Sequence, residues 1–261
     1  EPPYDFGSPQ KINQPNLVFS THLYTYGITG NYDGNIAILE RHLLQGYNKA
    51  VLQWKIPFWV GEFAIDSRVK RAGDWCRDYL TLMDKYMIGS AWWSYWMDDS
   101  SGSFYLLDSQ GREKPVFINT LDRPYPMSSS ATISSFLFNV TIRSFKIVLF
   151  SKENTSIHIH VPERHYPFGF EVSCNETQWD YSWDQDNQIL TVHINSIGFS
   201  QVSINPSVEE LQNEIQRLKQ DLTLAEEQMT LLKGAIALLV IALIICNSYW
   251  YSKVRRTPHK L

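Results

Sequence analysis

Glu62 is the side chain whose sequence context most clearly indicates chemistry. It follows the apolar run Phe58-Trp-Val-Gly61 and precedes Phe63-Ala64, so the pattern places a carboxylate at the end of a buried strand. Burying a carboxylate is costly unless the group is hydrogen-bonded or has a function. Taken alone, such a glutamate is either a functional group or the structural partner in an ion pair. The residues on neighbouring strands decide between these two interpretations.

His22 and Tyr24 favour the functional interpretation. They are two positions apart on a strand, so their side chains point to the same face. If that strand adjoins the strand of Glu62, an imidazole and a phenol both approach the carboxylate and orient it. Trp92 and Trp93 are adjacent on the next strand and therefore face opposite sides, so only one can enter the cleft. This combination is typical of a site that cleaves sugars.

Other kinds of site lack their motifs in this sequence. There is no Gly-rich phosphate loop and no HExxH zinc motif, and Cys76, Cys174 and Cys246 show no zinc-ligand spacing. We therefore expect neither a metal nor a cofactor. The net charge of −4 gives no basic surface for nucleic acid, so we expect no nucleic-acid binding. Nine Trp and fourteen Tyr residues suit a carbohydrate ligand.

The strands that must position these residues alternate with helices over residues 1–127. Apolar runs predict strands, and helical spacing predicts helices, in the order 17–24, 36–53, 58–63, 69–86 and 88–96. This βα alternation is typical of a parallel sheet in an α/β fold. Because three βα repeats are too few to close an eight-stranded barrel, we expect only part of one.

Residues 128–206 have a different pattern, in which short alternating runs are separated by turn-forming residues. It predicts an antiparallel β-sandwich with strands over 132–140, 146–150, 156–161, 168–172, 188–194 and 199–204. Residues 127–130, Met-Ser-Ser-Ser, are predicted to be the linker to this domain. Three N-glycosylation sequons begin at Asn139, Asn154 and Asn175, and they support an exterior location.

Residues 207–233 predict a coiled-coil-like stalk. An uninterrupted 3-4 spacing of apolar residues runs over four heptads through Val208, Leu211, Ile215, Leu218, Leu222, Ala225, Met229 and Leu232. At the flanking positions Glu214 and Lys219 attract across a parallel dimer, whereas Asp221 and Glu226 repel. Homo-oligomerisation through 208–232 and a lone amphipathic stalk are therefore equally good interpretations.

Residues 234–252 predict a transmembrane helix. The run 234–251 is mainly apolar and spans roughly 27 Å, enough for the hydrocarbon core of a thin bilayer. Tyr249, Trp250 and Tyr251 suit the membrane interface, and the basic tail 253–261 indicates a cytoplasmic C-terminus. A buried soluble helix is the alternative. We expect a single-pass membrane protein with the bulk of the chain extracellular or lumenal.

Three segments resemble the last three barrel strands of glycoside hydrolase family 5, in that order: His22-Leu-Tyr24, Trp59-Val-Gly-Glu-Phe63 and Ala91-Trp-Trp-Ser-Tyr-Trp96. Within that family the sequence is most similar to the endoglycoceramidase-like branch. Glu1-Pro2 with Asp5-Phe-Gly7 is similar to the segment after the fifth strand. Leu106-Leu-Asp108 and Arg123-Pro-Tyr-Pro126 resemble the end of the barrel. The resemblance covers residues 1–205 and implies strands 6–8 of a (β/α)8 TIM barrel, followed by a β-sandwich.

The resemblance also implies roles for the residues singled out above. Glu62 is expected to be the nucleophile of a retaining glycosidase, with Tyr24 positioning it and His22 contacting the site or the substrate. Trp93 is expected to form the floor under the sugar. Further substrate-binding candidates are Trp92 and Trp96. The family's acid/base follows an Asn on the fourth strand, and because no Asn-Glu-Pro occurs here, this group is expected to lie outside the chain.

The expected function is that of a membrane-anchored retaining β-glycoside hydrolase, present as a C-terminal fragment without its acid/base. The substrate would be a glycolipid or a β-glucan, and the fragment alone is not expected to turn over. A non-catalytic, membrane-tethered carbohydrate-binding protein is the alternative, and a structural tether with a vestigial barrel is a third hypothesis.

Overall fold

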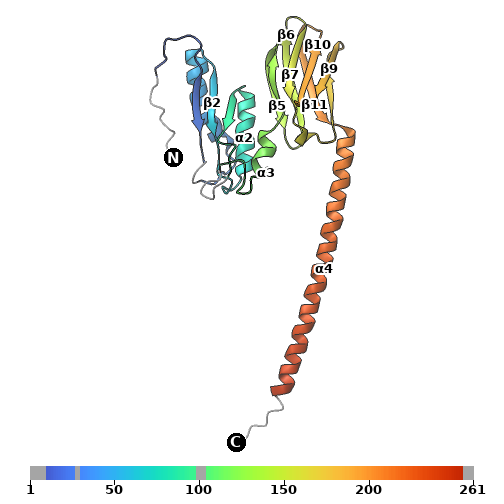
Figure 1. Ribbon diagram of the computed structural model, residues 1–261. Coiled ribbons are helices and arrows are strands. Elements are labelled where there is room, and N and C mark those ends of the chain that lie inside the picture. Colours follow the sequence, from blue (N-terminus) through green and yellow to red (C-terminus); the bar gives the residue numbers. More distant parts are fainter. Residues whose placement is uncertain (1–9, 27–29, 98–103, 255–261) are drawn as a thin grey trace. The chain divides into compact units, whose positions relative to one another are not determined.

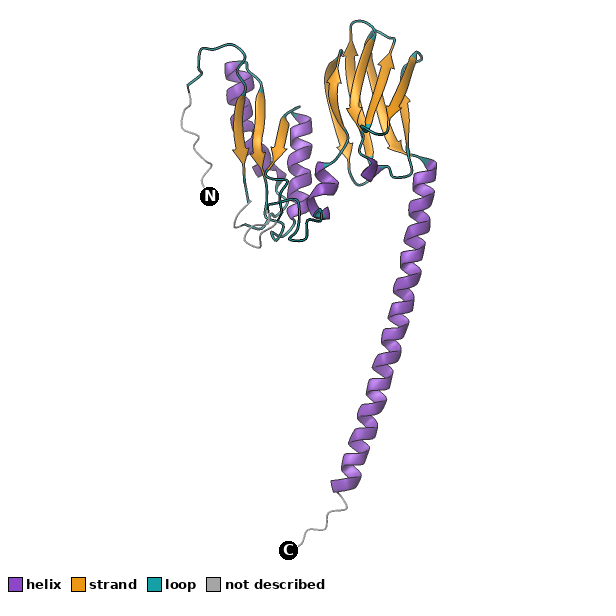
Figure 2. Ribbon diagram, in the orientation of Figure 1, coloured by secondary structure: helices purple, strands orange, loops and turns teal. Residues whose placement is uncertain are grey.

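Three parallel strands form the first sheet, in the order β1-β2-β3 (Figure 1). They are β1 (Phe19–Leu23), β2 (Phe58–Phe63) and β3 (Gly89–Trp92), and Figure 2 shows helices between them in the chain. This is the predicted βα alternation of a partial barrel.

The computed structural model describes residues 10–26, 30–97 and 104–254, without the side chains of 237 and 240–254. The opening segments that carried part of the resemblance, residues 1–7, lie outside the described residues.

The helices of this part are α1 (Ile36–Tyr47), α2 (Ala72–Lys85) and α3 (Pro115–Leu121). The predicted helix over 36–53 continues past α1 as a π-helix, η1 (Asn48–Trp54), and ends where Lys55 adopts a left-handed conformation with φ of 57°. The predicted helix over 69–86 begins later, because Arg71 at its N-cap is also left-handed. Sequence periodicity therefore located these helices but not their ends.

The helices pack on one face of the sheet. Leu23, Val60 and Phe63 on that face are buried in a shared core with Leu39, Leu43, Trp75, Tyr79 and Phe117 of the helices. His22 and Trp59 lie exposed on the strands between these buried positions. Because side chains alternate along a strand, the exposed residues occupy the opposite face, which no helix of the described residues covers.

Two four-stranded antiparallel sheets form the predicted β-sandwich, with strand orders β4-β7-β10-β9 and β5-β6-β11-β8. A short 3-10 helix, η2 (Glu163–His165), connects two of the strands. The core between the sheets contains Phe145, Ile147, Ile157, Val192 and Ile204, all buried. The strands are β4 (Tyr125–Ser129), β5 (Thr132–Asn139), β6 (Ser144–Ser151), β7 (Thr155–His160), β8 (Phe170–Cys174), β9 (Trp179–Asp184), β10 (Ile189–Ile194) and β11 (Gly198–Pro206).

Two strands of the sandwich correct the sequence analysis. The predicted linker at 127–130 is wrong, because residues 125–129 form β4 and pair with β7. A strand that contains Pro126 is tolerated there since β4 is an edge strand, and the register shifts between Pro126 and Ser128. The strand β9 was missed, although its aromatic residues alternate with polar ones. Its position at the opposite edge explains its many exposed residues.

A buried ion pair joins Asp84 of α2 to Arg123, next to the start of the sandwich. The Arg123 guanidinium donates to both carboxylate oxygens of Asp84, at 2.5 and 2.7 Å. Burial raises the pKa of Asp84 to about 6, and Arg123 opposes this shift. Next to this pair, the Asp122 carboxylate accepts a hydrogen bond from Arg164, and its backbone oxygen accepts one from His165.

The helix α4 (Val208–Val254) belongs to a second compact unit, Val208–Leu261, and the strands and shorter helices belong to the first, Glu1–Ser207. The apolar heptad residues of α4, such as Leu218 and Leu222, are exposed. No helix within the described part of the chain is long and apolar enough to cross a membrane. Most side chains of the predicted span 234–252, and the tail from 255 onward, lie outside the described residues.

Candidate active site

The site forms where β1 and β2 end side by side. The two strands are parallel, with His22 aligned to Glu62 in the ladder. Tyr24 follows the last residue of β1, on the same side as His22 by strand alternation. The strand that leads to His22 and Tyr24 therefore adjoins the strand of Glu62, as the functional interpretation of Glu62 requires. The carboxyl ends of parallel strands are also where barrel enzymes carry their active sites.

A β-bulge at Gly61 brings Glu62 to the uncovered face. Thr21 aligns with Val60, but the next residue, His22, aligns with Glu62, so β2 has one extra residue between these pairs. Val60 is buried against the helices, and strict alternation from it would turn Glu62 toward the helices as well. The bulge instead places Glu62 beside His22 and returns Phe63 to the core.

Only glycine fits at position 61 without displacing a neighbour. A Cβ atom there would lie 2.5 Å from the Ser20 hydroxyl oxygen and 3.3 Å from Nε2 of His22. The first of these distances is too short for a real contact, so a larger residue would push Ser20 aside and press on the His22 ring. This requirement arises from close approach rather than from an unusual φ angle.

Two side chains contact the same carboxylate oxygen. The Tyr24 hydroxyl donates to Oε2 of Glu62 at 2.6 Å, and Nδ1 of His22 lies 3.2 Å from that oxygen. Burial, together with the hydrogen bond and the charge of Glu62, raises the pKa of Tyr24, so the phenol stays protonated and donates at neutral pH. The Glu62 side chain is 28% exposed, which leaves it open to a ligand.

The two oxygens of the Glu62 carboxylate differ in their contacts within the described residues. Among the residues that the structure describes, the contacts of this carboxylate all go to Oε2. These contacts hold the carboxylate in one orientation, and no donor from the described residues contacts Oε1. A carboxylate fixed in this way is suited to nucleophilic attack.

The adjacent tryptophans of the third strand differ in exposure, with Trp92 partly buried and Trp93 exposed. The Trp92 ring packs on Phe63, Trp75 and Phe117 in the helix-side core, and its Nε1 donates to the Phe104 oxygen at 2.8 Å. Trp92 is therefore partly buried against the helix-side core, and its expected role in substrate binding stays a prediction.

Trp93 remains the better candidate for the sugar platform. Its backbone N–H donates to the Phe63 oxygen at 3.1 Å, which extends the ladder by one residue and turns the side chain toward the face of Glu62. The ring is 48% exposed, as a stacking surface for a sugar requires. Trp96 is 65% exposed and lies past the strand, so its role stays a prediction.

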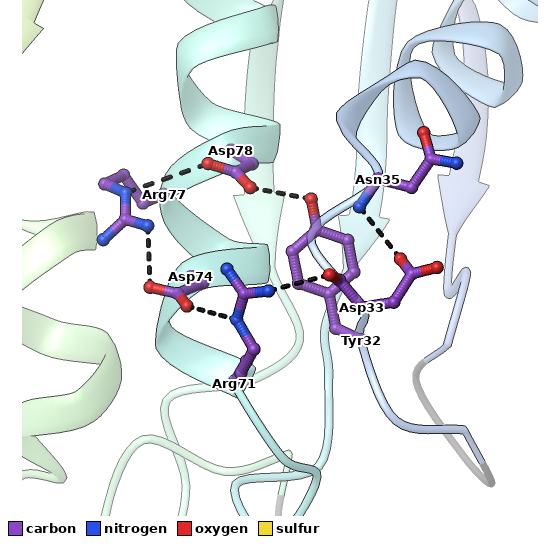
Figure 3. Close-up of polar contacts among 7 residues, drawn as sticks. All are labelled: Tyr32, Asp33, Asn35, Arg71, Asp74, Arg77 and Asp78. Carbon is purple, nitrogen blue, oxygen red and sulfur yellow. Dashed lines mark hydrogen bonds and ion pairs between the residues drawn. The ribbon is translucent and has the colours of Figure 1, made fainter.

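A polar network fixes the segment that follows the site on β1 (Figure 3). The buried Tyr32 donates its hydroxyl proton to Asp78 of α2 at 2.7 Å, and Arg71 donates to the Asp33 backbone oxygen at 2.7 Å. Arg71 also pairs with Asp74 in the first turn of α2. Figure 3 shows these groups meeting near the start of α2, where Tyr32 and Asp33 are held against that helix.

Thr25 is the residue near the site that the sequence analysis missed. It directly follows Tyr24, and it contacts three side chains from two helices, Trp75 and Tyr79 of α2 and His42 of α1. Because these partners lie 17 to 54 positions away in the chain, no local spacing marks Thr25.

In the described part of the chain, no group of three His, Cys, Asp or Glu side chains is placed to hold a metal ion. The glycosylation candidates Asn139, Asn154 and Asn175 are all exposed in the sandwich. The side-chain oxygen of Asn139 accepts the Thr141 N–H at 3.0 Å, and that of Asn175 accepts the Gln201 N–H at 2.7 Å.

Comparison with protein families supports this description. Residues 123–205 match the family model described as the glycoside hydrolase family 5 C-terminal domain, and this segment contains the strands of the sandwich except the last residue of β11. No curated protein sequence matches the chain.

Solved structures extend the likeness to the barrel part. Endo-glycoceramidase II from Rhodococcus sp. is similar over 75% of this chain and 44% of its own, with a TM-score of 0.59 and 19% identity. Sterylglucosidase 1 from Cryptococcus neoformans is similar over 66% of this chain and 32% of its own, with a TM-score of 0.55 and 12% identity. The chain thus spans less than half of either structure, and the likeness concerns the fold. Together, the family match and these structures confirm the resemblance to an endoglycoceramidase-like C-terminal part of glycoside hydrolase family 5.

Proposed function

We propose that this chain carries the nucleophile, Glu62, of a retaining β-glycoside hydrolase. The observation behind this proposal is the approach of Tyr24 and His22 to one oxygen of Glu62, on the uncovered face of the parallel sheet. Endo-glycoceramidase II from Rhodococcus sp., which shares the fold, has been solved as a lactosyl-enzyme intermediate. A covalent glycosyl-enzyme is the intermediate that a nucleophilic glutamate forms.

The proposed reaction has two steps. In the first, Oε1 of Glu62 attacks the anomeric carbon while the bond to the leaving oxygen breaks, and an acid gives that oxygen its proton. In the second, water attacks the anomeric carbon of the glycosyl-enzyme, the bond from that carbon to Oε1 of Glu62 breaks to release the carboxylate, and the same acid group, now a base, takes the proton of the water. We assign this acid/base to a residue outside the chain, so the chain alone is not expected to turn over a natural glycoside.

A glycolipid is the substrate class we favour, and a β-glucan is the second candidate. The Rhodococcus enzyme has been solved with ganglioside GM3, and the name of the Cryptococcus enzyme refers to a sterol glucoside. Ganglioside GM3 and a sterol glucoside each join a sugar to a lipid. A chain anchored in a bilayer would meet such substrates at the membrane surface, whereas a soluble glucan would gain nothing from the anchor.

The membrane anchor is itself part of the proposal. The apolar run 234–251 and the basic tail 253–261 support a single span with the C-terminus in the cytoplasm and the sandwich outside. If so, alkaline carbonate washing leaves the chain in the membrane pellet, and protease added outside intact cells digests residues before 234. Release by carbonate would contradict the anchor. The exposed heptad stripe of α4 supports self-association through 208–232, which cross-linking of the intact chain tests.

Covalent trapping tests the nucleophile without needing the missing acid. A 2-deoxy-2-fluoro-β-glycoside of dinitrophenol has a leaving group that departs without protonation, and its fluorine slows the second step. We expect the peptide that contains Glu62 to gain the mass of the fluorosugar, and Glu62→Gln to abolish the gain. The matched control is Glu171→Gln on β8, an exposed glutamate in the sandwich that should leave labelling unchanged.

The same experiment separates the two candidate functions. A non-catalytic carbohydrate-binding protein would bind lactose in a calorimeter yet acquire no covalent sugar. Labelling that persists in Glu62→Gln, or that appears on another residue, would rule out Glu62 as the nucleophile. Labelling of the unaltered chain at Glu62 would rule out the purely binding function.

A further inference from the structure

Thr25 is held at three points immediately after Tyr24. Its backbone oxygen accepts a hydrogen bond from Nε1 of Trp75 at 2.7 Å. Its hydroxyl oxygen accepts one from the Tyr79 hydroxyl at 3.1 Å and lies 2.6 Å from Nδ1 of His42. Both the backbone and the side chain of this residue are therefore fixed.

The groups that hold Thr25 belong to a rigid part of the molecule. Trp75 and Tyr79 are fully buried on α2, and their rings meet edge to face at 4.7 Å between centroids. His42 lies on α1, which packs against both α2 and β1. Buried, close-packed side chains on helices move little, so these contacts set the backbone position at the end of β1.

The three polar side chains have compatible donors and acceptors. Burial raises the pKa of Tyr79, so its hydroxyl keeps the proton that it donates to Thr25. Burial, with the nearby Arg41, lowers the pKa of His42, so the ring is neutral near pH 7 and can accept at Nδ1. A chain of hydrogen bonds then runs from Tyr79 through the Thr25 hydroxyl to His42.

We propose that Thr25 is a positioning residue that acts through Tyr24. It fixes the backbone beside Tyr24 so that the phenol reaches Oε2 of Glu62. Tyr24 lies between a clamped residue on one side and the carboxylate on the other, and its hydrogen bond of 2.6 Å depends on both. The proposal rests on the proposed role of Glu62 for its catalytic meaning, but the positioning itself has a separate readout.

The separate readout is the ionisation of Tyr24. It is measured by NMR on protein that carries ¹³Cζ-labelled tyrosine. The Tyr24 signal is assigned by its loss in Tyr24→Phe. In the unaltered chain the pKa of this phenol is raised, so it ionises at a higher pH than an ordinary tyrosine, whose pKa is near 10. Glu62→Gln serves as the positive control, because it removes the partner whose charge and hydrogen bond raise this pKa.

Thr25→Val tests the clamp because valine has the shape of threonine but no hydroxyl. We expect Tyr24 to ionise at a lower pH in Thr25→Val than in the unaltered chain, and at the unaltered pH in Thr25→Ser, which keeps the hydroxyl. Tyr79→Phe removes the hydrogen bond from Tyr79 to the Thr25 hydroxyl and leaves Thr25 unaltered. It should shift the pKa of Tyr24 in the same direction, but by less. It also keeps the test valid if Thr25→Val fails to fold.

Covalent labelling then measures the consequence for the site. We expect Thr25→Val to slow labelling of Glu62 about tenfold, as small misplacements near a reacting group do, and Thr25→Ser to stay within about twofold. In a Tyr24→Phe background, Thr25→Val should slow labelling no further. An equal loss in that background would mean that Thr25 acts through general destabilisation, and the proposal would fail.

The two readouts distinguish failure of this inference from failure of the proposed function. An unchanged Tyr24 ionisation in both Thr25→Val and Tyr79→Phe overturns the positioning role, whatever the labelling shows. Absence of labelling in the unaltered chain counts against the nucleophile and leaves the NMR test of Thr25 intact.

Discussion

The Tyr24 hydroxyl lies 2.6 Å from Oε2 of Glu62, although 38 positions separate the two residues in the chain. Three features bring them together: parallel pairing of β1 with β2, the bulge at Gly61, and the clamp on Thr25. Each feature can be altered separately by mutation, so the geometry of the candidate site can be tested one part at a time.

Tyr24→Phe should slow covalent labelling of Glu62 by about tenfold to a hundredfold. A hydrogen bond to a charged group contributes about 1.5–3 kcal/mol, which corresponds to this range of rates when the carboxylate loses its orientation. Stability should change little, because Glu62 is partly exposed and water can replace the phenol. Tyr181→Phe, a half-exposed tyrosine on β9, is the matched control and should label at the unaltered rate. Equal rates in both variants would remove Tyr24 from the site.

Gly61→Ala should slow labelling about tenfold, because the new methyl group meets the Ser20 hydroxyl at 2.5 Å and the His22 ring at 3.3 Å. Adding Ser20→Ala removes the shorter of these contacts. The double variant should therefore recover most of the rate, while Ser20→Ala alone should label normally. A double variant as slow as Gly61→Ala would show that the Ser20 hydroxyl does not explain the need for glycine.

Arg123→Ala should lower the free energy of unfolding by about 3–5 kcal/mol, because it leaves the Asp84 carboxylate buried without a partner. Chemical denaturation of the chain at pH 8 measures this loss. The control is Arg112→Ala, which breaks an exposed pair with Asp108 and should leave the stability close to that of the unaltered chain. Similar effects of the two variants would contradict a special role for the buried pair.

The pH dependence of stability should reveal Asp84 as well. Its pKa is raised from the ordinary value of 3.8 to about 6 in the folded chain, mainly by burial. Between about pH 4 and pH 6 the folded state then binds this proton more tightly than the unfolded state does. This carboxyl therefore makes the free energy of unfolding fall as the pH rises through that window.

Asp84→Asn isolates this contribution. The difference in unfolding free energy between the unaltered chain and the variant should change across pH 4 to 6 in the sense just given, and should stay constant between pH 7 and 8. Denaturation curves at each pH measure it. A difference that is constant across the whole range, or that changes in the opposite sense, would contradict the raised pKa.

Much of the candidate site could be predicted from the sequence because strand alternation is strictly local. The same-face relation of His22 and Tyr24, and the opposite faces of Trp92 and Trp93, follow from a spacing of two and of one. Which tryptophan enters the core could not be predicted this way. That choice depends on Trp75 and Phe117, which lie on helices elsewhere in the chain.

The features that were missed depend on neighbours distant in sequence. The bulge at Gly61 is defined only by comparing β2 with β1 and β3, and the clamp on Thr25 requires the packing of two helices. The strand β4 resembled a linker because Pro and Ser weaken a strand signal, and its place at a sheet edge tolerates them. The bulge, the clamp and strand β4 all depend on tertiary contacts that a local sequence pattern does not contain.

Within the described residues, each outer strand of the first sheet, β1 and β3, pairs with another strand on one side only. A strand edge with unpaired backbone N–H and C=O groups is a template for other strands, and the exposed Trp59 of the central strand β2 adds an apolar surface to the same sheet. At high concentration, the solubility of this chain should therefore be limited by strand addition at these two edges. Any attempt to crystallise or concentrate it would benefit from a companion polypeptide that occupies them.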